Sequence, residues 1–175
     1  MQAIMDKARH IRLVIFDVDG ILTSGTLFYG ANGAEMRDFH VHDGQGMKSL
    51  QESGVKIAII SARQSEVVTK RMQDLDVRYV IQGQSPKLPA YEKLKQELNL
   101  ADQHIAYMGD DLPDLAVLKR AGLSVTVANA PQVIRDQVDW VTHNDGGKGA
   151  ARELCDMILH AQNNFQSNVD TYLKS

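Results

Sequence analysis

The chain has 175 residues, of which 43% are hydrophobic and 23% charged, and its formal net charge is −3. These proportions are typical of one globular domain with a substantial core, and the weak negative charge gives no reason to expect nucleic acid or an anionic membrane surface as a partner. The sequence has no membrane-length apolar run, no apolar signal segment at its start and only one cysteine, Cys155. We therefore expect a cytoplasmic protein without a disulfide.

Apolar runs alternate with amphipathic stretches along the chain, which predicts a Rossmann-like α/β fold with a mainly parallel sheet and helices on both faces. The expected strands span 11–16, 55–60, 78–81, 104–108, 123–127 and 138–142. The expected helices span 2–9, 44–53, 64–74, 86–98, 111–121, 131–136 and 148–163. We assign 1–163 to one domain and 164–175 to a polar tail, which we expect to be partly mobile unless it docks.

The first strand runs directly into Asp17-Val-Asp19-Gly20, which places two carboxylates at the end of a buried strand. Two acids this close repel each other, so a cation between them is expected. Oxygen ligands favour a hard ion such as Mg²⁺. A solvated turn is the alternative, because Asp and Gly are common turn residues.

The segment 24–42 departs from the strand–helix alternation and predicts a projecting β-hairpin. Two short apolar stretches flank a Gly30-Ala-Asn-Gly33 turn. Leu27, Phe28, Tyr29, Met36 and Phe39 would form an adhesive surface if they were exposed. We expect this hairpin to pack against other subunits, and the alternative is a hairpin folded over its own domain.

Polar side chains follow further strands. Ser61 directly follows the strand 55–60 and could hold a phosphate oxygen or cap the following helix. Lys87 follows Ser85-Pro86, precedes the helical stretch Leu88–Leu98, and would be taken for a surface lysine if it stood alone. The strand 104–108 ends in Gly109-Asp110-Asp111, with Asp114 close behind. A favourable helix dipole explains one of these acids but not three, and Asp110 is the natural third carboxylate for a cation held by Asp17 and Asp19.

In this order and context, the four segments resemble the motifs of the haloacid dehalogenase superfamily of phosphotransferases. The first family motif is Asp-x-Asp-Gly-x-x-Thr after a strand, which is matched by Asp17, Asp19, Gly20 and Thr23. The remaining three motifs are matched by Ser61, by Lys87 and by Gly109, Asp110, Asp111 and Asp114. The likeness is strongest to capless members of the superfamily and covers nearly the whole chain.

The resemblance implies a mechanism. Asp17 attacks phosphorus and forms an aspartyl-phosphate, while Asp19 protonates the leaving alcohol and then activates water. Mg²⁺ is bound by Asp17, Asp110 and the Asp19 carbonyl oxygen, and Ser61 and Lys87 hold the non-bridging phosphate oxygens. Members with other chemistries tend to replace the second acid, so Asp19 favours a phosphatase or mutase.

The spacing leaves no room for a cap domain, because 42 residues separate Asp19 from Ser61 and 23 separate Lys87 from Asp110. An open site needs a neighbouring subunit to exclude water, and the family likeness implies a homotetramer with the hairpin at subunit contacts. It also implies a sugar-acid phosphate pocket lined by Asp19, His40, Val41, His42, Asp43, Gly44, Arg63, Arg71, Lys87 and Pro113. Arginine suits a substrate carboxylate because its fork binds both oxygens.

His40 and His42 could also be interpreted as a metal pair. Their i, i+2 spacing in a strand would direct both rings to one side, but neither a Cys nor a third His lies near them in the sequence. We therefore expect polar contacts in the pocket rather than a second metal site.

The expected function is Mg²⁺-dependent hydrolysis of an eight-carbon sugar-acid phosphate. A nine-carbon acylneuraminate phosphate is the alternative substrate. A non-catalytic tetramerisation module is an alternative of a different kind, and the complete set Asp17, Asp19, Lys87 and Asp110 argues against it.

Overall fold

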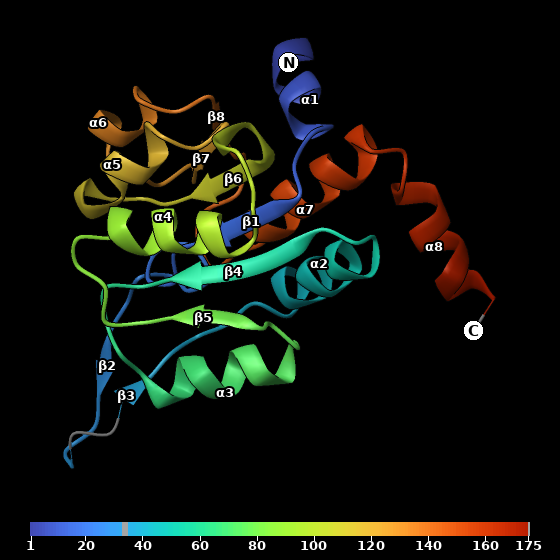
Figure 1. Cartoon of the computed structure of the whole chain (residues 1–175). Helices are drawn as coiled ribbons and strands as arrows, with labels where there is room; N and C mark the ends of the chain where they lie inside the picture. The colour runs from blue at the N-terminus through green and yellow to red at the C-terminus, as the bar shows by residue number, and fades with distance from the viewer. Residues whose placement is uncertain (33–34, 175) are drawn as a thin grey trace.

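The computed structural model describes residues 1–32 and 35–174, and a six-stranded sheet forms its centre (Figure 1). The strands lie in the order β5-β4-β1-β6-β7-β8, and every neighbouring pair is parallel. Their bounds are β1 Leu13–Phe16, β4 Lys56–Ile60, β5 Tyr79–Ile81, β6 Ile105–Met108, β7 Leu123–Thr126 and β8 Trp140–Val141. The predicted parallel sheet and all six of its expected strands are confirmed.

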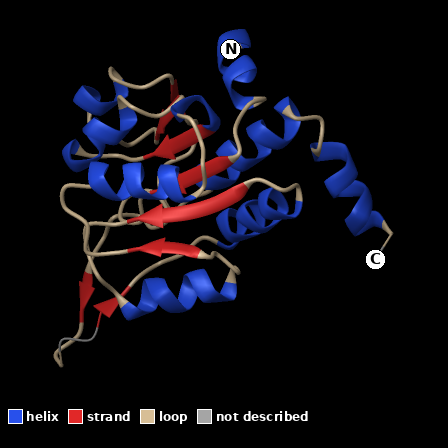
Figure 2. Cartoon of the chain, in the orientation of Figure 1, coloured by secondary structure: helices blue, strands red, loops and turns tan. Residues whose placement is uncertain are grey.

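Helices cover both faces of this sheet (Figure 2). The connection from β1 to β4 runs toward the β5 edge of the sheet, and the connection from β5 to β6 runs back toward the β8 edge. Because such connections are right-handed, α2 and α4 lie on opposite faces. α2 packs against α7 on one face, and α4 packs against α5 on the other. The helices are α1 Gln2–Ala8, α2 Val41–Glu52, α3 Glu66–Asp74, α4 Leu88–Glu97, α5 Leu115–Leu118, α6 Gln132–Arg135, α7 Ala150–Ala161 and α8 Phe165–Leu173.

The central strands hold the core. All four residues of β1 and all four of β6 are buried, as expected for strands covered on both faces. The chain leaves β1 in one direction and returns to β6 on its other side, so the topological switch point lies between these two strands. Ligands bind at such a point beyond the carboxyl ends of the strands. Asp17 follows β1 there, and Gly109 and Asp110 follow β6.

Two local expectations were wrong. α2 begins at Val41 instead of residue 44, so His40 caps a helix and His42 lies in its first turn rather than in a strand. The expected helix 111–121 is a 3₁₀ turn, η2 Leu112–Asp114, followed by the short α5. The segment 165–173 is helical, and Gln45 Nε2 donates to Tyr172 Oη at 2.7 Å, so α8 docks on its own chain.

The expected hairpin forms as two short antiparallel strands, β2 Phe28–Tyr29 and β3 Glu35–Met36. Gly33 of its predicted turn lies outside the described residues. The hairpin extends from the side of the molecule to which the β4 and β5 arrowheads point, whereas α8 lies on the opposite side (Figure 1). Within the described chain, no helix combines the length and hydrophobicity that a membrane span requires.

Candidate active site

A cavity of about 280 Å³ opens at the carboxyl edge of the sheet, and we call it the carboxyl-edge cavity. It brings together residues from all four sequence segments described above. Its lining consists of Asp17, Asp19, Gly20, Gly25, Ser61, Ala62, Arg63, Lys87, Asp110, Asp111, Pro113 and Asp114. The predicted meeting of these segments at one edge of the sheet is therefore observed.

Lys87 lies buried between two carboxylates. Its Nζ atom is 2.7 Å from Asp17 Oδ1 and 2.7 Å from Asp114 Oδ1, and only 3% of its side chain is exposed. Burial alone would lower the pKa of Lys87, but the negative charges of Asp17 and Asp114 outweigh it and raise that pKa. The Lys87 ammonium is therefore a fixed positive charge beside the Asp17 carboxylate.

Asp114, to which the sequence assigned no role, binds Lys87 as Asp17 does and accepts several further hydrogen bonds. Its Oδ1 accepts hydrogen bonds from Lys87 Nζ and the Tyr107 hydroxyl, and its Oδ2 accepts from the backbone N–H groups of Asp110 and Asp111 at 3.2 and 3.3 Å. These bonds tie the loop after β6 to Lys87. Asp114 thus fixes both Lys87 and Asp110 in place.

Three carboxylates in the cavity have the arrangement of a divalent cation site. One oxygen from each of Asp17, Asp110 and Asp114 lies within 4.8 Å of the others. Burial, and then the charge of Asp114, raises the pKa of Asp17 from 3.8 to about 7. Burial, Asp114 and Asp111 raise the pKa of Asp110 to about 7 as well. Acids that resist ionisation this strongly fit a hard cation such as Mg²⁺, which restores their charged form.

Gly20 allows this close approach. A Cβ atom at Gly20 would lie 2.1 Å from Asp110 Oδ2, and the residue has φ of +86°, which L side chains rarely adopt. The glycine of the predicted Asp-x-Asp-Gly pattern therefore does more than turn the chain. It lets the loop after β1 lie directly against Asp110.

Asp19 enters the cavity but stays outside the carboxylate cluster. Its Oδ1 accepts a hydrogen bond from Arg37 Nη1 at 2.6 Å. The predicted role of the Asp19 backbone carbonyl as a metal ligand remains a prediction. Nothing in the sequence singled out Arg37, because it reaches Asp19 only through the path of the hairpin.

Ser61 and Arg63 line the same cavity. Ser61 is buried, and its Oγ accepts a hydrogen bond from the Arg63 backbone at 3.3 Å. The Arg63 side chain is 42% exposed, donates to the Tyr29 hydroxyl at 2.8 Å and lies 3.4 Å from Glu35. Its guanidinium is therefore accessible to a ligand carboxylate.

The predicted pocket residues of α2 and α3 do not reach this cavity within one chain. His40, Asp43, Gly44 and Arg71 line a separate, very small cavity of about 10 Å³, and Val41 is 70% exposed. The Asp43 carboxylate accepts hydrogen bonds from the backbone of Gly149 and Arg152, so it anchors the start of α7.

The rings of His40 and His42 meet edge to face, with centroids 5.0 Å apart. The Arg71 guanidinium lies 5.7 Å above the Phe39 ring. The substrate role of 40–44 and Arg71 remains a prediction.

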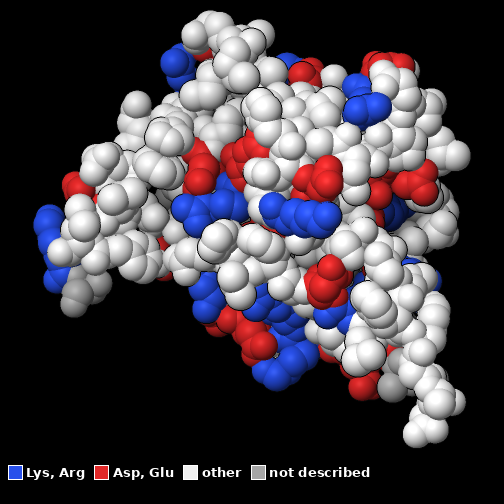
Figure 3. Space-filling model, turned by 180° about the vertical axis from the view of Figure 1, so that it is seen from behind, with Lys and Arg blue, Asp and Glu red and all other residues white. Residues whose placement is uncertain are grey.

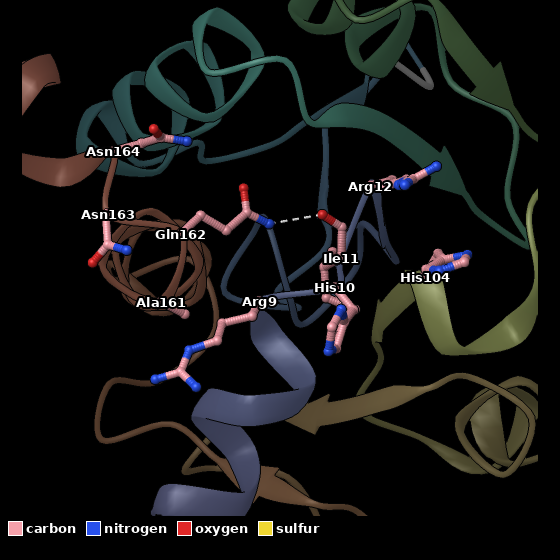
Figure 4. Close-up of a pocket in the computed structure, with 9 residues that line it drawn as sticks. All are labelled: Arg9, His10, Ile11, Arg12, His104, Ala161, Gln162, Asn163 and Asn164. Atoms are coloured by element: carbon pink, nitrogen blue, oxygen red, sulfur yellow. Dashed lines mark hydrogen bonds between the residues drawn. The ribbon is translucent and has the colours of Figure 1, made fainter.

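A larger hollow of about 470 Å³ lies at the opposite, amino edge of the sheet (Figure 4). Arg9, Arg12 and His104 contribute to its lining, and Gln162 closes one side by donating to the Ile11 carbonyl at 2.8 Å. Arg9 is already paired with Asp6 at 2.9 Å. The chemistry-bearing carboxylates all lie at the other edge.

Charged side chains of both signs are interspersed over the face seen from behind (Figure 3). This distribution accords with the small net charge.

Comparisons with known proteins agree with this site. The family model described as haloacid dehalogenase-like hydrolase matches residues 79–154. A 3-deoxy-D-manno-octulosonate 8-phosphate phosphatase from Salmonella typhi is 44% identical over 159 residues, which cover 91% of this chain and 85% of the relative. The corresponding enzyme of Escherichia coli K12 is 43% identical over the same coverage.

Solved structures of similar phosphatases agree with these sequence comparisons. A 3-deoxy-D-manno-octulosonate 8-phosphate phosphatase from Moraxella catarrhalis, in complex with magnesium, phosphate and a KDO molecule, superposes with a TM-score of 0.96 at 43% identity. The match covers 98% of this chain and 99% of that one. A probable YrbI family phosphatase from Pseudomonas syringae pv. phaseolica has a TM-score of 0.98 at 43% identity, covering 100% of this chain and 99% of that one.

Proposed function

The chain belongs to the haloacid dehalogenase-like hydrolases, and within them to the 3-deoxy-D-manno-octulosonate 8-phosphate phosphatases, and from this we propose its reaction. The enzyme hydrolyses 3-deoxy-D-manno-octulosonate 8-phosphate to the free sugar acid and inorganic phosphate, with Mg²⁺ as its cofactor. It is a phosphoric monoester hydrolase, and we place its reaction in the synthesis of lipopolysaccharide precursors.

The observation that carries this proposal is the buried Lys87, held at 2.7 Å from both Asp17 and Asp114 in a cavity that also contains Asp110. The Asp17 carboxylate is the nucleophile, and its bond to phosphorus forms as the ester oxygen leaves. Lys87 and Ser61 hold non-bridging oxygens of the phosphoryl group, over which the transition-state charge is spread. Mg²⁺, held by Asp17 and Asp110, would supply the positive charge that lets the anionic nucleophile approach the anionic phosphate.

Asp19 serves as the proton carrier of both half-reactions. It gives a proton to the oxygen of the leaving sugar alcohol when the P–O bond breaks. It then takes a proton from the water that attacks phosphorus and releases Asp17. Its place on the cavity wall, two residues after Asp17, supports this division of roles.

Arg63 is the group that we assign to the substrate carboxylate. Its side chain is 42% exposed and lines the same cavity as Pro113. A planar guanidinium binds both oxygens of a carboxylate, which distinguishes a sugar-acid phosphate from a neutral sugar phosphate. The Moraxella relative holds a KDO molecule and a phosphate ion together, which is consistent with a substrate of this kind.

We also propose a homotetramer in the cytoplasm. The hairpin exposes Phe28, Tyr29 and Met36 by 47%, 64% and 61%, and it extends from the body of the molecule (Figure 1), although Tyr29 and Glu35 also contact Arg63 of the same chain. An apolar projection of this kind favours contact with other subunits. Residues 40–44 and Arg71 could then complete a neighbour's pocket. The buried free thiol of Cys155 is compatible with a reducing compartment.

The test is phosphate release from 3-deoxy-D-manno-octulosonate 8-phosphate, an acylneuraminate 9-phosphate and simple sugar phosphates, each with Mg²⁺ and with EDTA. We expect strong Mg²⁺-dependent preference for the eight-carbon ester. Preference for the nine-carbon ester would overturn the substrate, and the absence of release from every ester would favour a non-catalytic assembly module.

A further inference from the structure

Arg37 holds the proton-carrying Asp19 from a different part of the chain. Arg37 directly follows β3 of the hairpin, 18 positions after Asp19, and its Nη1 donates to Asp19 Oδ1 at 2.6 Å. Only 1% of the Arg37 side chain is exposed, whereas 24% of the Asp19 side chain is. A buried arginine that contacts a carboxylate so closely fixes its orientation.

Glu35 holds Arg37 from the other side. Glu35 Oε1 accepts hydrogen bonds from Arg37 Nε at 3.3 Å and from Arg37 Nη2 at 2.9 Å, so the guanidinium bridges two acids and cannot rotate freely. The Arg37 hydrogen bond contributes most to lowering the pKa of Glu35, which keeps this partner ionised. The guanidinium is thus held by the hairpin strand itself.

We propose that Arg37 is a positioning residue for proton transfer, and this inference rests on the function proposed above. By binding Asp19 Oδ1, Arg37 leaves Oδ2 as the oxygen that exchanges a proton with the ester oxygen. In the first half-reaction the P–O bond to the sugar breaks, an Asp17–phosphorus bond forms, and the proton on Asp19 goes to the sugar oxygen. A misoriented Asp19 would leave an unstable sugar alkoxide as the leaving group.

The structure of the leaving group therefore provides the test. A sugar alcohol needs a proton from Asp19, whereas p-nitrophenolate is stable as an anion and leaves without one. The parameter to compare is kcat/KM, because it reports steps only up to the first irreversible bond cleavage and so excludes the later hydrolysis of the aspartyl-phosphate.

For Arg37→Met, we expect kcat/KM for 3-deoxy-D-manno-octulosonate 8-phosphate to fall by about 10- to 100-fold. This loss is smaller than the full rate contribution of a general acid, because Asp19 itself is still present. For p-nitrophenyl phosphate, we expect a fall of less than about threefold. Arg37→Lys keeps the charge and should recover part of the lost activity toward the sugar ester only. Arg9→Met is the matched control, because it also removes an Arg–Asp pair but at the surface of α1, and it should leave both substrates unaffected.

The outcomes distinguish a failure of the proposed function from a failure of the role proposed for Arg37. If the unmodified enzyme hydrolyses neither ester, the proposed function fails. If it hydrolyses both and Arg37→Met loses the two activities equally, Arg37 has only a structural role and the inference is overturned. Should Arg37→Met fail to fold, the Arg37→Lys variant decides alone, because selective loss on the sugar ester supports positioning and equal or absent loss refutes it.

Discussion

Replacing Asp110 by Asn should stabilise the metal-free protein, although it removes a group that we assign to the metal site. The pKa of Asp110 rises from 3.8 to about 7 in the folded protein, chiefly through burial and the charge of Asp114. A carboxyl group whose pKa is raised on folding does not lower the free energy of unfolding below about pH 4. Its destabilising effect grows as the pH rises and is complete once the pH passes about 7. The penalty is therefore fully present at pH 8 and small at pH 4.

The size of the effect follows from this shift. Three pKa units correspond to roughly 4 kcal/mol, and because Asp110 is only partly buried we reduce this to about 2 kcal/mol at pH 8. For a chain of this length, a gain of that size raises Tm by about 4–8 °C. At pH 5 less than about half of the gain should remain, because most of the ionisation of folded Asp110 occurs at higher pH.

The assay is thermal unfolding of both proteins in EDTA at pH 5 and pH 8, and again with Mg²⁺. Excess Mg²⁺ should stabilise the unmodified protein, by about 3 kcal/mol at a hundred times its Kd, and leave Asp110→Asn almost unchanged. Asp136→Asn, at the exposed end of α6, makes the same change in charge and serves as the control. A lower Tm of Asp110→Asn than of the unmodified protein in EDTA at pH 8 would refute the reasoning, as would a difference that does not depend on pH.

Three further predictions concern turnover and assembly. Asp17→Asn removes the nucleophile and should reduce phosphate release by at least about a thousandfold, while residual turnover near the original rate would rule out Asp17 as nucleophile. Phe28→Asp places a charge on the exposed hairpin and should shift the mass measured by light scattering from tetramer toward smaller species; an unchanged mass would locate the subunit contacts elsewhere. Truncation after Gln162 removes α8 and should change KM or kcat if α8 reaches a neighbour's site, and identical kinetics would exclude that role.

Strands were the most predictable part of the fold. β1 and β6 read as unbroken apolar runs because both faces of each strand are covered, and each run stops where the chain turns into acidic residues. The residues at these strand ends could be placed in one cavity because parallel strands with right-handed crossovers share a carboxyl edge. Topology therefore places Asp17, Lys87 and Asp110 at the same edge of the sheet, and the resemblance to the haloacid dehalogenase superfamily implied that Lys87 acts beside the other two.

The start of α2 could not be predicted because tertiary packing decides it. Gly44 and Gly46 lower the helix propensity of this segment, so the local pattern gave no reason to begin the helix as early as Val41. In the structure, a Cβ atom at Gly46 would lie 2.6 Å from Arg152 Cδ, which shows how closely α2 approaches α7. Asp43 then binds the start of α7, and these contacts outweigh the local preference.

Arg37 was missed for a different reason. Its contact with Asp19 depends on the direction in which the hairpin leaves the domain, and no periodicity in the sequence encodes that direction. Asp114 was visible as one of three acids within five residues, but its partners Lys87 and Tyr107 come from separate elements. Contacts between side chains from separate elements, such as these, can be identified only in the structure.

The charges in the carboxyl-edge cavity explain why a divalent ion and a phosphate ester belong there together. Asp17, Asp110 and Asp114 carry three negative charges when ionised, and Lys87 supplies one positive charge, so the cluster is left with an excess of two negative charges. Burial, and then the negative charge of Asp114, raises the pKa of Asp17 and of Asp110 to about 7. A doubly charged cation cancels the excess of negative charge, whereas a monovalent cation leaves one carboxylate uncompensated. We therefore expect a dianionic phosphate to bind beside Lys87 more tightly when the divalent ion is present.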